Sequence, residues 1–282
     1  MVLKKNVLVI TGITGFIGNS ILNNKDFVKN FTIYGLNSSG YFKLEDSLIE
    51  IDETNFLKSI KQSKSLSILH LATFYSLDEV DKEQIIHSNY EFGLSFFNLL
   101  LENEIVITTI LYTNTMFLFF DENNIKKSTY VLTKNKFSEY LNSISKKQGI
   151  NFIEIYLNNT FGPNDTRKKI IPLIFDSLLN KKEFQIKNPE KFISLIPIDK
   201  ILEIFIKLLN KKESYKAVVY SSLEYELDSL NSYIFKSYND KKREKIKSIK
   251  FSELNGVPKN IESIIVDFEL EIELEKLLSK LR

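Results

Sequence analysis

Tyr130 and Lys134 are two residues whose types and spacing could perform acid–base chemistry. They stand four positions apart in 130-YVLTK-134, so on a helix their side chains share one face. A free tyrosine titrates near pKa ~10, and a neighbouring lysine ammonium stabilises the phenolate and lowers that pKa. Such a pair could exchange a proton with a carbonyl or hydroxyl oxygen. Alone it is weak evidence, because the chain holds 13 tyrosines and many lysines.

Thr115 could supply a third group to the same chemistry. It follows the apolar run 106-VITTILYTN-114, which predicts a strand, and it precedes Tyr130 by about fifteen residues. At the end of that strand its hydroxyl could hold a substrate oxygen while Tyr130 transfers the proton. A threonine at a strand end is common for purely structural reasons, so the hypothesis depends on the order of all three residues.

A glycine-rich segment, 11-TGITGFIG-18, lies directly between the first apolar run and the first helical pattern. Gly12 permits a tight turn, Gly15 lets the backbone approach a pyrophosphate, and Gly18 allows close packing of helix on strand. The start of the helix would then offer N–H groups to the phosphates. Tight turns between strands and helices also need glycine, but the position after the first strand favours dinucleotide binding.

The second apolar run ends at Asn37-Ser38-Ser39, where NAD enzymes usually place an acidic residue for the ribose hydroxyls. Asn37 removes the carboxylate that would repel a 2′-phosphate, and the hydroxyls of Ser38 and Ser39 could donate to one. This favours NADP(H) over NAD(H), although no arginine follows. Asp52, after the run 48–51, is placed to accept a hydrogen bond from adenine; simple surface solvation of its carboxylate is the alternative.

Short apolar runs alternate with helical patterns through the first two thirds of the chain. This predicts an α/β fold, a Rossmann-type doubly wound parallel sheet that is buried on both faces. The expected strands are 6–11, 31–36, 48–51, 66–72, 106–114 and 152–157, and the expected helices are 17–24, 54–63, 82–103 and 130–149.

After Gly162-Pro163 the pattern loosens, with helices expected at 169–181, 199–211 and 270–282 and a strand at 216–222. We therefore expect an NAD(P)-binding domain mainly over residues 1–165. Residues 166–282 are expected to form a small C-terminal substrate-binding cap, interleaved with late strands of the sheet.

Taken together, these motifs resemble the extended short-chain dehydrogenase/reductases, the NAD-dependent epimerase/dehydratase family, over about residues 6–205. The matching motifs are 12-GITGFIG-18, 70-HLA-72, Asn89 with Gly93, the trio Thr115, Tyr130 and Lys134, and 159-NTFGP-163. Within the family, 68-ILHLATFYS-76, 130-YVLTK-134 and 161-FGPND-165 are most similar to the reductases of CDP-linked 4-keto-dideoxyhexoses.

The resemblance implies a role for each matched residue. It makes Thr115, Tyr130 and Lys134 catalytic, and it places Phe74, Tyr75 and Asn159 at the substrate. The cofactor-binding residues that it implies, together with those argued above, are Gly12, Thr14, Gly15, Phe16, Ile17, Asn37, Ser38, Ser39, Asp52, Glu53, Leu71, Ala72, Thr73, Asn89, Tyr130 and Lys134.

The implied activity is hydride transfer to or from a nucleotide-linked sugar, as a 4-ketoreductase acting on a CDP- or dTDP-linked 4-keto-deoxyhexose. A 4-epimerase that recycles NAD and a non-catalytic NAD(P)-binding regulator are the alternatives. Family dehydratases place Asp and Glu directly after the catalytic Thr, where this chain has Met116 and Phe117. Two arginines that often bind the substrate are also absent, since Tyr156 and Ile193 stand at their positions.

Composition excludes several other classes of protein. With 38 basic and 36 acidic residues the net charge is only +2, so nucleic acid and membrane surfaces are not expected partners. No cysteine and only two histidines are present, so no metal site is expected. No run approaches the roughly 18 apolar residues of a membrane span, so a cytoplasmic location is expected.

A homodimer is expected from the helices near 84–101 and 131–146. These helices carry more apolar residues than one sheet-facing stripe requires, and many members of the resembling family pair the same helices. The residues concerned are Ile85, Phe92, Phe96, Leu99, Val131, Phe137, Tyr140, Leu141 and Ile144.

Overall fold

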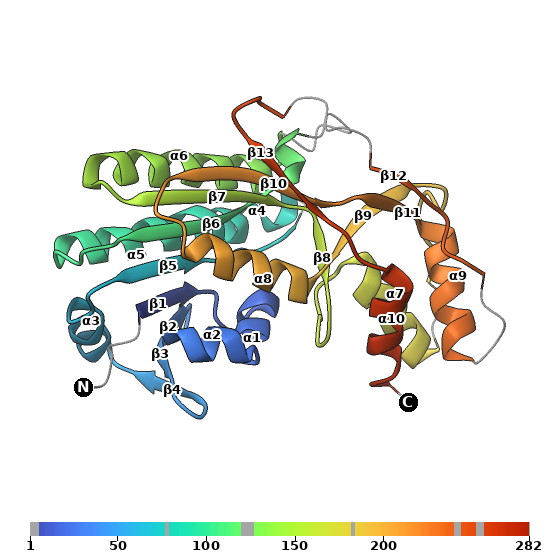
Figure 1. The fold of residues 1–282 in the computed structure, drawn as a ribbon, viewed down its shortest axis with the longest axis horizontal. Coiled ribbons are helices and arrows are strands. Elements are labelled where there is room, and N and C mark those ends of the chain that lie inside the picture. The colour runs from blue at the N-terminus through green and yellow to red at the C-terminus, as the bar shows by residue number, and fades with distance from the viewer. Residues whose placement is uncertain are drawn as a thin grey trace. The chain divides into compact units, whose positions relative to one another are not determined.

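The computed structural model describes residues 6–76, 79–119, 127–181, 184–239, 244–251 and 257–281. Its helices and strands are labelled in Figure 1. The chain divides into two compact units. The first unit comprises residues 1–156, 204–217 and 254–262, and the second comprises 157–203, 218–253 and 263–282.

The first unit is built on a mixed β-sheet whose central strands are parallel. β1 (Asn6–Thr11) pairs in parallel with β2 (Phe31–Asn37) on one side and with β5 (Leu66–His70) on the other, and β5 pairs in parallel with β6 (Thr109–Thr115). The nine strands are ordered β13-β10-β7-β6-β5-β1-β2-β3-β4. The chain passes from β1 to β2 on one side of β1 and later adds β5 on the other side. The carboxyl ends of β1 and β5 therefore form a topological switch point, which is where open α/β sheets bind ligands.

The central strands are long apolar runs because both of their faces are covered. Every residue of β5 and β6 is buried, as are the five residues of β7 (Asn151–Leu157) between its two ends. The strands β10 (Tyr215–Ser221) and β13 (Glu262–Val266) begin in this unit. The expected α/β fold with a Rossmann-type sheet is confirmed.

One edge of the sheet differs from the sequence prediction. β3 (Gly40–Leu44) was not expected, and it pairs antiparallel with β2 and with β4 (Leu48–Ile51). Residues 48–51 are therefore a strand, as expected, but not a parallel one. The physical reason is the length of the connections. A parallel crossover needs about a dozen residues or more and usually a helix, whereas β2 is joined to β3, and β3 to β4, by short segments that contain no helix.

Helices of the first unit cover the sheet. They are α1 (Phe16–Leu22), α2 (Lys25–Asn30), α3 (Glu53–Lys61), α4 (Lys82–Ile86), α5 (Phe92–Glu102) and α6 (Thr129–Gln148). Short 3₁₀ turns lie at Glu79–Asp81 and Met116–Phe119, and α8 (Ile198–Leu209) ends in this unit. Ser128 caps the start of α6 by accepting from Val131 N, and Gly149, with φ of 68°, ends it.

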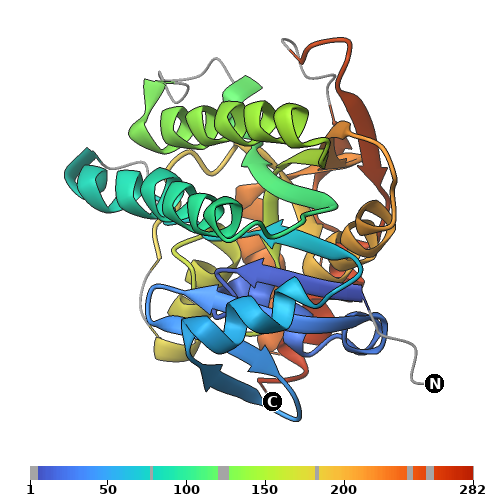
Figure 2. The ribbon, with the colours of Figure 1, turned by 90° about the vertical axis from the view of Figure 1, so that its left-hand side faces the viewer.

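The expected helix 82–103 is continuous but contains a π-helical turn, His87–Glu91, between α4 and α5. Helix α6 packs against α4, against this turn and against β6. Figure 2 shows α5 and α6 running side by side over one face of the sheet.

The core beneath these helices is largely aromatic. The ring of Phe137, on α6, packs against Phe97, Tyr112 and His70, with centroid distances of 6.1, 5.6 and 4.7 Å. The helices have less spare apolar surface than the sequence pattern predicted, because many of the residues expected at a dimer interface are buried within the chain itself: Ile85, Phe96, Val131, Phe137 and Leu141.

The second unit has a four-stranded sheet in the order β12-β11-β9-β8. Its strands are β8 (Asn159–Phe161), β9 (Phe192–Pro197), β11 (Leu223–Glu226) and β12 (Ser248–Lys250), and its helices are α7 (Ile170–Asn180), α9 (Leu227–Tyr238) and α10 (Leu270–Leu278). It has its own hydrophobic core, in which Phe161, Ile174, Leu230 and Leu274 are buried. Within the described ranges of both units, no helix is long and apolar enough to cross a membrane.

Candidate active site

Thr115, Tyr130 and Lys134 all lie in the first unit, and all three side chains are buried. Thr115 is the last residue of β6, and its Oγ1 accepts a hydrogen bond of 3.3 Å from Phe117 N. Tyr130 and Lys134 occupy successive turns at the start of α6, where they are 7% and 3% exposed. The low exposure means that a charge on either residue interacts more strongly than it would in water.

Lys134 connects α6 to the segment that follows β5. Its Nζ donates to Thr73 Oγ1 at 2.9 Å and lies 5.0 Å from the centroid of the Tyr112 ring. The Tyr112 hydroxyl in turn donates to the Lys134 carbonyl oxygen at 3.0 Å. Burial lowers the pKa of Lys134 to about 7, while the charge of Glu154 acts in the opposite direction. Lys134 can therefore exist as an ammonium or an amine near neutral pH.

Tyr130 stands in an apolar surround. Its ring meets that of Tyr75 edge-on, with centroids 5.1 Å apart, and Phe74 and Phe117 belong to the same cluster. Phe74 and Tyr75, expected at the substrate, are thus brought to the expected catalytic tyrosine. Such a wall excludes water, which strengthens the interaction of Tyr130 with nearby charges.

Asn89 is buried in the π-helical turn and holds the backbone of Phe74 from both sides. Its Oδ1 accepts from Phe74 N at 2.7 Å, and its Nδ2 donates to Phe74 O at 3.1 Å. In this structure the side chain therefore fixes the segment that carries Thr73, Phe74 and Tyr75. That contact explains why an asparagine suits this position.

The glycine loop is fitted tightly against the end of β5. Gly12 has φ of 68°, and a Cβ there would lie 2.9 Å from Ala72 N and Cα. A Cβ on Gly18 would lie 2.3 Å from Ile13 O. Thr11 Oγ1 accepts from the backbone N–H groups of Leu71 and Ala72, both at 3.1 Å. The expected cofactor residues of the loop and of 71–73 thus form one continuous backbone surface.

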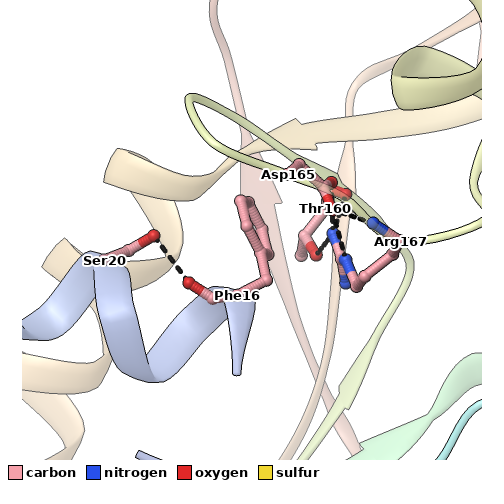
Figure 3. A network of polar contacts seen from close by, with 5 residues as sticks. All are labelled: Phe16, Ser20, Thr160, Asp165 and Arg167. Carbon is pink, nitrogen blue, oxygen red and sulfur yellow. Dashed lines mark hydrogen bonds and ion pairs between the residues drawn. The ribbon is translucent and has the colours of Figure 1, made fainter. Parts of the chain in front are cut away.

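Helix α1 begins at this loop with Gly15 as its N-cap, so no side chain caps the helix. Phe16 and Ile17 are half-buried in its first turn, and the Phe16 carbonyl accepts from Ser20 Oγ at 2.9 Å (Figure 3). A Cβ on Gly15 would meet only Gly12 O, at 3.2 Å. The loop from Gly12 to Gly18 and the start of α1 therefore form a cradle lined by backbone, without side chains in the way, as a bound pyrophosphate requires.

Asn37 organises the turn between β2 and β3. Its Oδ1 accepts from Ser39 N at 2.8 Å, from Ser39 Oγ at 2.6 Å and from Gly40 N at 3.2 Å. Its Nδ2 donates to Thr14 Oγ1 of the glycine loop at 3.2 Å. Asn37 thereby connects the turn to the glycine loop.

A cavity of about 460 Å³ opens beside this turn, and its lining includes Asn37, Ser38, Ser39 and Glu53. Glu53 accepts a hydrogen bond of 2.7 Å from the Tyr41 hydroxyl. Among the described residues that line the cavity there is no lysine or arginine.

Asp52 does not line this cavity but caps helix α3. Its Oδ1 accepts from Asn55 N at 2.8 Å, and its Oδ2 accepts from Asn55 Nδ2 at 2.5 Å. These hydrogen bonds lower the pKa of Asp52. An adenine amino group would have to share oxygens that are already engaged.

Asn159, expected at the substrate, belongs to the second unit. Its Nδ2 donates to Asn158 Oδ1 at 3.1 Å and to Ser194 O at 3.4 Å. Nearby in the chain, the Arg167 guanidinium is held by Asp165 through two bonds of 2.7 Å and by the Thr160 carbonyl at 2.7 Å (Figure 3). Arg167 also lines a cavity of about 560 Å³ within this unit. This arginine was not among the residues expected at the site from the sequence.

A second residue that the sequence analysis missed is Glu154, on β7. Its side chain is fully buried and accepts hydrogen bonds from Asn114 Nδ2 at 2.7 Å and from Lys216 Nζ at 2.6 Å. The available signal was a carboxylate within the apolar run 152-FIEIYL-157, because a buried strand can hold a charge only if that charge is paired. No group of three or more His, Cys, Asp or Glu residues that could hold a metal occurs among the described residues.

A sheet with parallel central strands, a glycine loop after β1 and a Tyr–Lys pair on the helix after β6 together define an enzyme of the short-chain dehydrogenase/reductase type. The chain belongs to the NAD dependent epimerase/dehydratase family, whose model matches residues 8–219. The family is NAD(P)-dependent. The resemblance expected from the sequence motifs is thus confirmed.

Among curated proteins, a CDP-abequose synthase of Salmonella typhimurium is 26% identical over 228 residues, which cover 76% of this chain and 73% of the relative. A UDP-N-acetylglucosamine 4-epimerase from Methanobrevibacter ruminantium, in complex with UDP-N-acetylmuramic acid, aligns with a TM-score of 0.72 at 17% identity, covering 98% of each chain. A UDP-N-acetylglucosamine 4-epimerase from Bacillus cereus aligns with a TM-score of 0.73 at 14% identity, covering 99% of this chain and 97% of its own. The two solved structures show that the fold is shared.

Proposed function

We propose that this protein reduces the 4-keto group of a CDP- or dTDP-linked deoxyhexose. The observation that carries the proposal is the geometry of the first unit, where buried Tyr130 and Lys134 share the first turns of α6 and Lys134 is bonded to Thr73. The substrate class is supported by the similarity to a CDP-abequose synthase. That similarity extends over about three quarters of each chain.

The first unit fits a nicotinamide dinucleotide. The loop from Gly12 to Gly18 would hold the pyrophosphate, because added Cβ atoms would fill this cradle or clash with backbone around it. Asn37, Ser38 and Ser39 would lie at the adenosine ribose, and Thr73 with Lys134 at the nicotinamide ribose. When bound, the dinucleotide supplies or accepts the hydride of the reaction.

The chain's own residues provide the proton and the orientation. Tyr130 donates its hydroxyl proton to the carbonyl oxygen of the sugar, and Thr115 Oγ1 holds that oxygen by a second hydrogen bond. The Lys134 ammonium stabilises the phenolate that remains on Tyr130. Phe74, Tyr75 and Phe117 keep water away from the transfer.

Elimination of water is not expected from this site. A dehydratase needs a base for the sugar C5 proton and an acid for the departing hydroxyl, directly after the catalytic threonine. Met116 is buried in that position and Phe117 packs in the apolar cluster, so neither side chain can exchange a proton. A 4-epimerase uses the same three residues as a reductase and is the second candidate, favoured by the fold it shares with the two solved epimerases.

The test is incubation of the purified protein with NADPH and a CDP- or dTDP-linked 4-keto-6-deoxy sugar while the absorbance of the reduced cofactor is followed. Stoichiometric loss of NADPH together with a 4-hydroxy product supports the reductase. A changed sugar without net loss of NADPH indicates the epimerase. Tight cofactor binding without any turnover indicates a regulator. In a separate incubation with a CDP- or dTDP-hexose, formation of a 4-keto-6-deoxy product would overturn the argument from Met116 and Phe117.

For the cofactor, we propose that NADP(H) binds more tightly than NAD(H), by a small factor. Asn37 places no charge near a 2′-phosphate, and the Ser38 hydroxyl lies at the same turn, whereas the Ser39 hydroxyl already donates to Asn37 Oδ1. The factor is small because the lining of the cavity, within the part of the chain that the structure describes, includes Glu53 but neither arginine nor lysine.

A further inference from the structure

Glu154 is a carboxylate in the middle of a strand that is otherwise apolar. Its side chain has no exposed surface, and its neighbours on β7, from Phe152 to Tyr156, are buried as well. Burying an ionised carboxylate is costly unless the charge is paired and its oxygens accept hydrogen bonds. The partners of Glu154 therefore indicate what the charge is for.

Three donors from three other elements converge on this carboxylate. Asn114 Nδ2, at the end of β6, donates to Oε1 at 2.7 Å, and Ser138 Oγ, on α6, donates to the same oxygen at 2.5 Å. Lys216 Nζ, on β10, donates to Oε2 at 2.6 Å. An ionised carboxylate is an acceptor only, so this set of donors fits the charged form.

Two of the donors lead directly to the candidate catalytic residues. Asn114 also accepts, through its Oδ1, a hydrogen bond of 2.8 Å from the backbone N–H of Thr115. Ser138 follows Lys134 by one helical turn, so both side chains lie on the same face of α6. Glu154 thus connects the strand end that carries Thr115 to the helix that carries Lys134.

We propose that Glu154 is a positioning residue of the active site, which fixes the end of β6 against helix α6 and supplies a negative charge that acts on Lys134. The inference rests on the proposed roles of Thr115, Tyr130 and Lys134. It assigns to Glu154 no contact with substrate or cofactor.

The electrostatic part of the proposal follows from the surrounding groups. Burial raises the pKa of Tyr112 and Tyr156, and Glu154 raises both further, by its charge and, at Tyr156, also by a side-chain hydrogen bond, so both are neutral phenols. Burial lowers the pKa of His70 to about 3, so it is neutral near pH 7. Lys216 is a cation, but a third of its side chain is exposed. Among these groups Glu154 carries the negative charge, and it raises the pKa of Lys134 against the effect of burial.

Glu154→Gln tests this, because glutamine keeps the size of the side chain and an acceptor oxygen but removes the charge. Lys216 can then turn its ammonium to water, so no buried charge is left unpaired. The pH midpoint at which Lys134 loses its proton should fall by about one unit. It is read from the affinity for NADPH, followed by cofactor fluorescence, and from kcat. Near pH 7.5 kcat should drop several-fold with KM changed less, and the difference should close at lower pH.

Ser138→Ala is the matched control, because it removes one donor and keeps the charge. It should lower the melting temperature while leaving the pH midpoint at the wild-type value. A folded Glu154→Gln protein with the wild-type midpoint would overturn the proposal, as would an equal shift in Ser138→Ala. If Glu154→Gln alone does not fold, the double variant Glu154→Gln/Lys216→Met removes both charges. The pH midpoint at which its Lys134 loses the proton is then compared with the wild-type value. The NADPH titration needs no sugar substrate, so it distinguishes failure of this inference from failure of the proposed reduction.

Discussion

Lys134 Nζ donates a hydrogen bond of 2.9 Å to Thr73 Oγ1, and through it helix α6 is joined to the segment that leaves β5. The same segment packs against the glycine loop, since Ala72 lies beside Gly12 and donates its N–H to Thr11. One side chain therefore connects the helix of the candidate acid, Tyr130, to the backbone that would hold the cofactor.

Tyr130→Phe should reduce turnover by about two to four orders of magnitude and leave cofactor affinity nearly unchanged. The substitution removes the hydroxyl but keeps the ring that packs against Tyr75. Steady-state rates and NADPH fluorescence titration measure the two effects. Tyr140→Phe, on the same helix but bonded to Asn98, is the control and should retain activity. A Tyr130→Phe protein with more than a few per cent of the wild-type rate would show that another group is the acid.

Lys134→Met should change how stability depends on pH. In the folded protein the pKa of Lys134 is lowered from 10.5 to about 7, so between these values the unfolded chain binds a proton that the folded chain does not. This contribution makes the free energy of unfolding rise with pH across that window, by at most about 1.4 kcal/mol per pH unit. Urea unfolding at about pH 7 and about pH 9 should show that the free energy of unfolding rises less with pH in Lys134→Met than in the wild type. Equal rises would mean that Lys134 titrates outside this window.

Gly15→Ala and Gly18→Ala should fail in different ways. A Cβ on Gly15 would meet only the Gly12 carbonyl, at 3.2 Å, so we expect a folded protein whose affinity for the dinucleotide is lower because the methyl group occupies the cradle. A Cβ on Gly18 would lie 2.3 Å from Ile13 O, so the loop itself must move and the melting temperature should fall. Gly149→Ala, with no atom within 4 Å of the added Cβ, is the control for backbone strain. It should lose stability without losing cofactor affinity.

Asn37→Asp should move cofactor preference toward NADH. An aspartate can keep the three hydrogen bonds that Asn37 Oδ1 accepts from Ser39 and Gly40, so the turn should persist. The new charge would repel a 2′-phosphate and accept from ribose hydroxyls. The ratio of the two dissociation constants, measured for wild type and variant, tests this. A wild-type protein that copurifies with NAD and does not bind NADPH would contradict the proposed preference.

A homodimer remains a prediction, and it now depends on fewer residues. Phe92, Leu99, Tyr140 and Ile144 are only partly buried in the single chain, and Leu132 on α6 is 56% exposed. Light scattering at micromolar concentration should give a mass of twice that of the chain, and Leu132→Glu should lower it. A monomeric mass for the wild type would reject the dimer.

The fold was predictable where the sequence pattern is local. The run 6–11 matches β1 at both ends, because a strand buried on both faces is a continuous apolar run. The run 106–114 was less well placed, since the strand spans Thr109–Thr115 and Val106 is 80% exposed. The hairpin β2–β3 depends on the side chain of Asn37 within its turn, which composition does not reveal.

The candidate site was predictable only in part, for a different reason. Tyr130 and Lys134 follow from helical spacing, and their order after Thr115 from the chain itself. Glu154 becomes meaningful only through Asn114, Ser138 and Lys216, which are 40, 16 and 62 residues away in the sequence. Such a convergence depends on which strands are neighbours, and no periodicity within β7 expresses it.

Because of the π-helical turn His87–Glu91, the number of residues in this helix decides which way Asn89 faces. A turn of this kind accommodates one residue more than an α-helical turn does, and each residue of a helix rotates the chain by about 100°. Deleting one residue here would let α4 and α5 merge into a regular helix, but it would swing Asn89 away from the backbone of Phe74 that it now holds. Insertions and deletions should therefore be tolerated less at this turn than any count of its hydrophobic contacts would suggest.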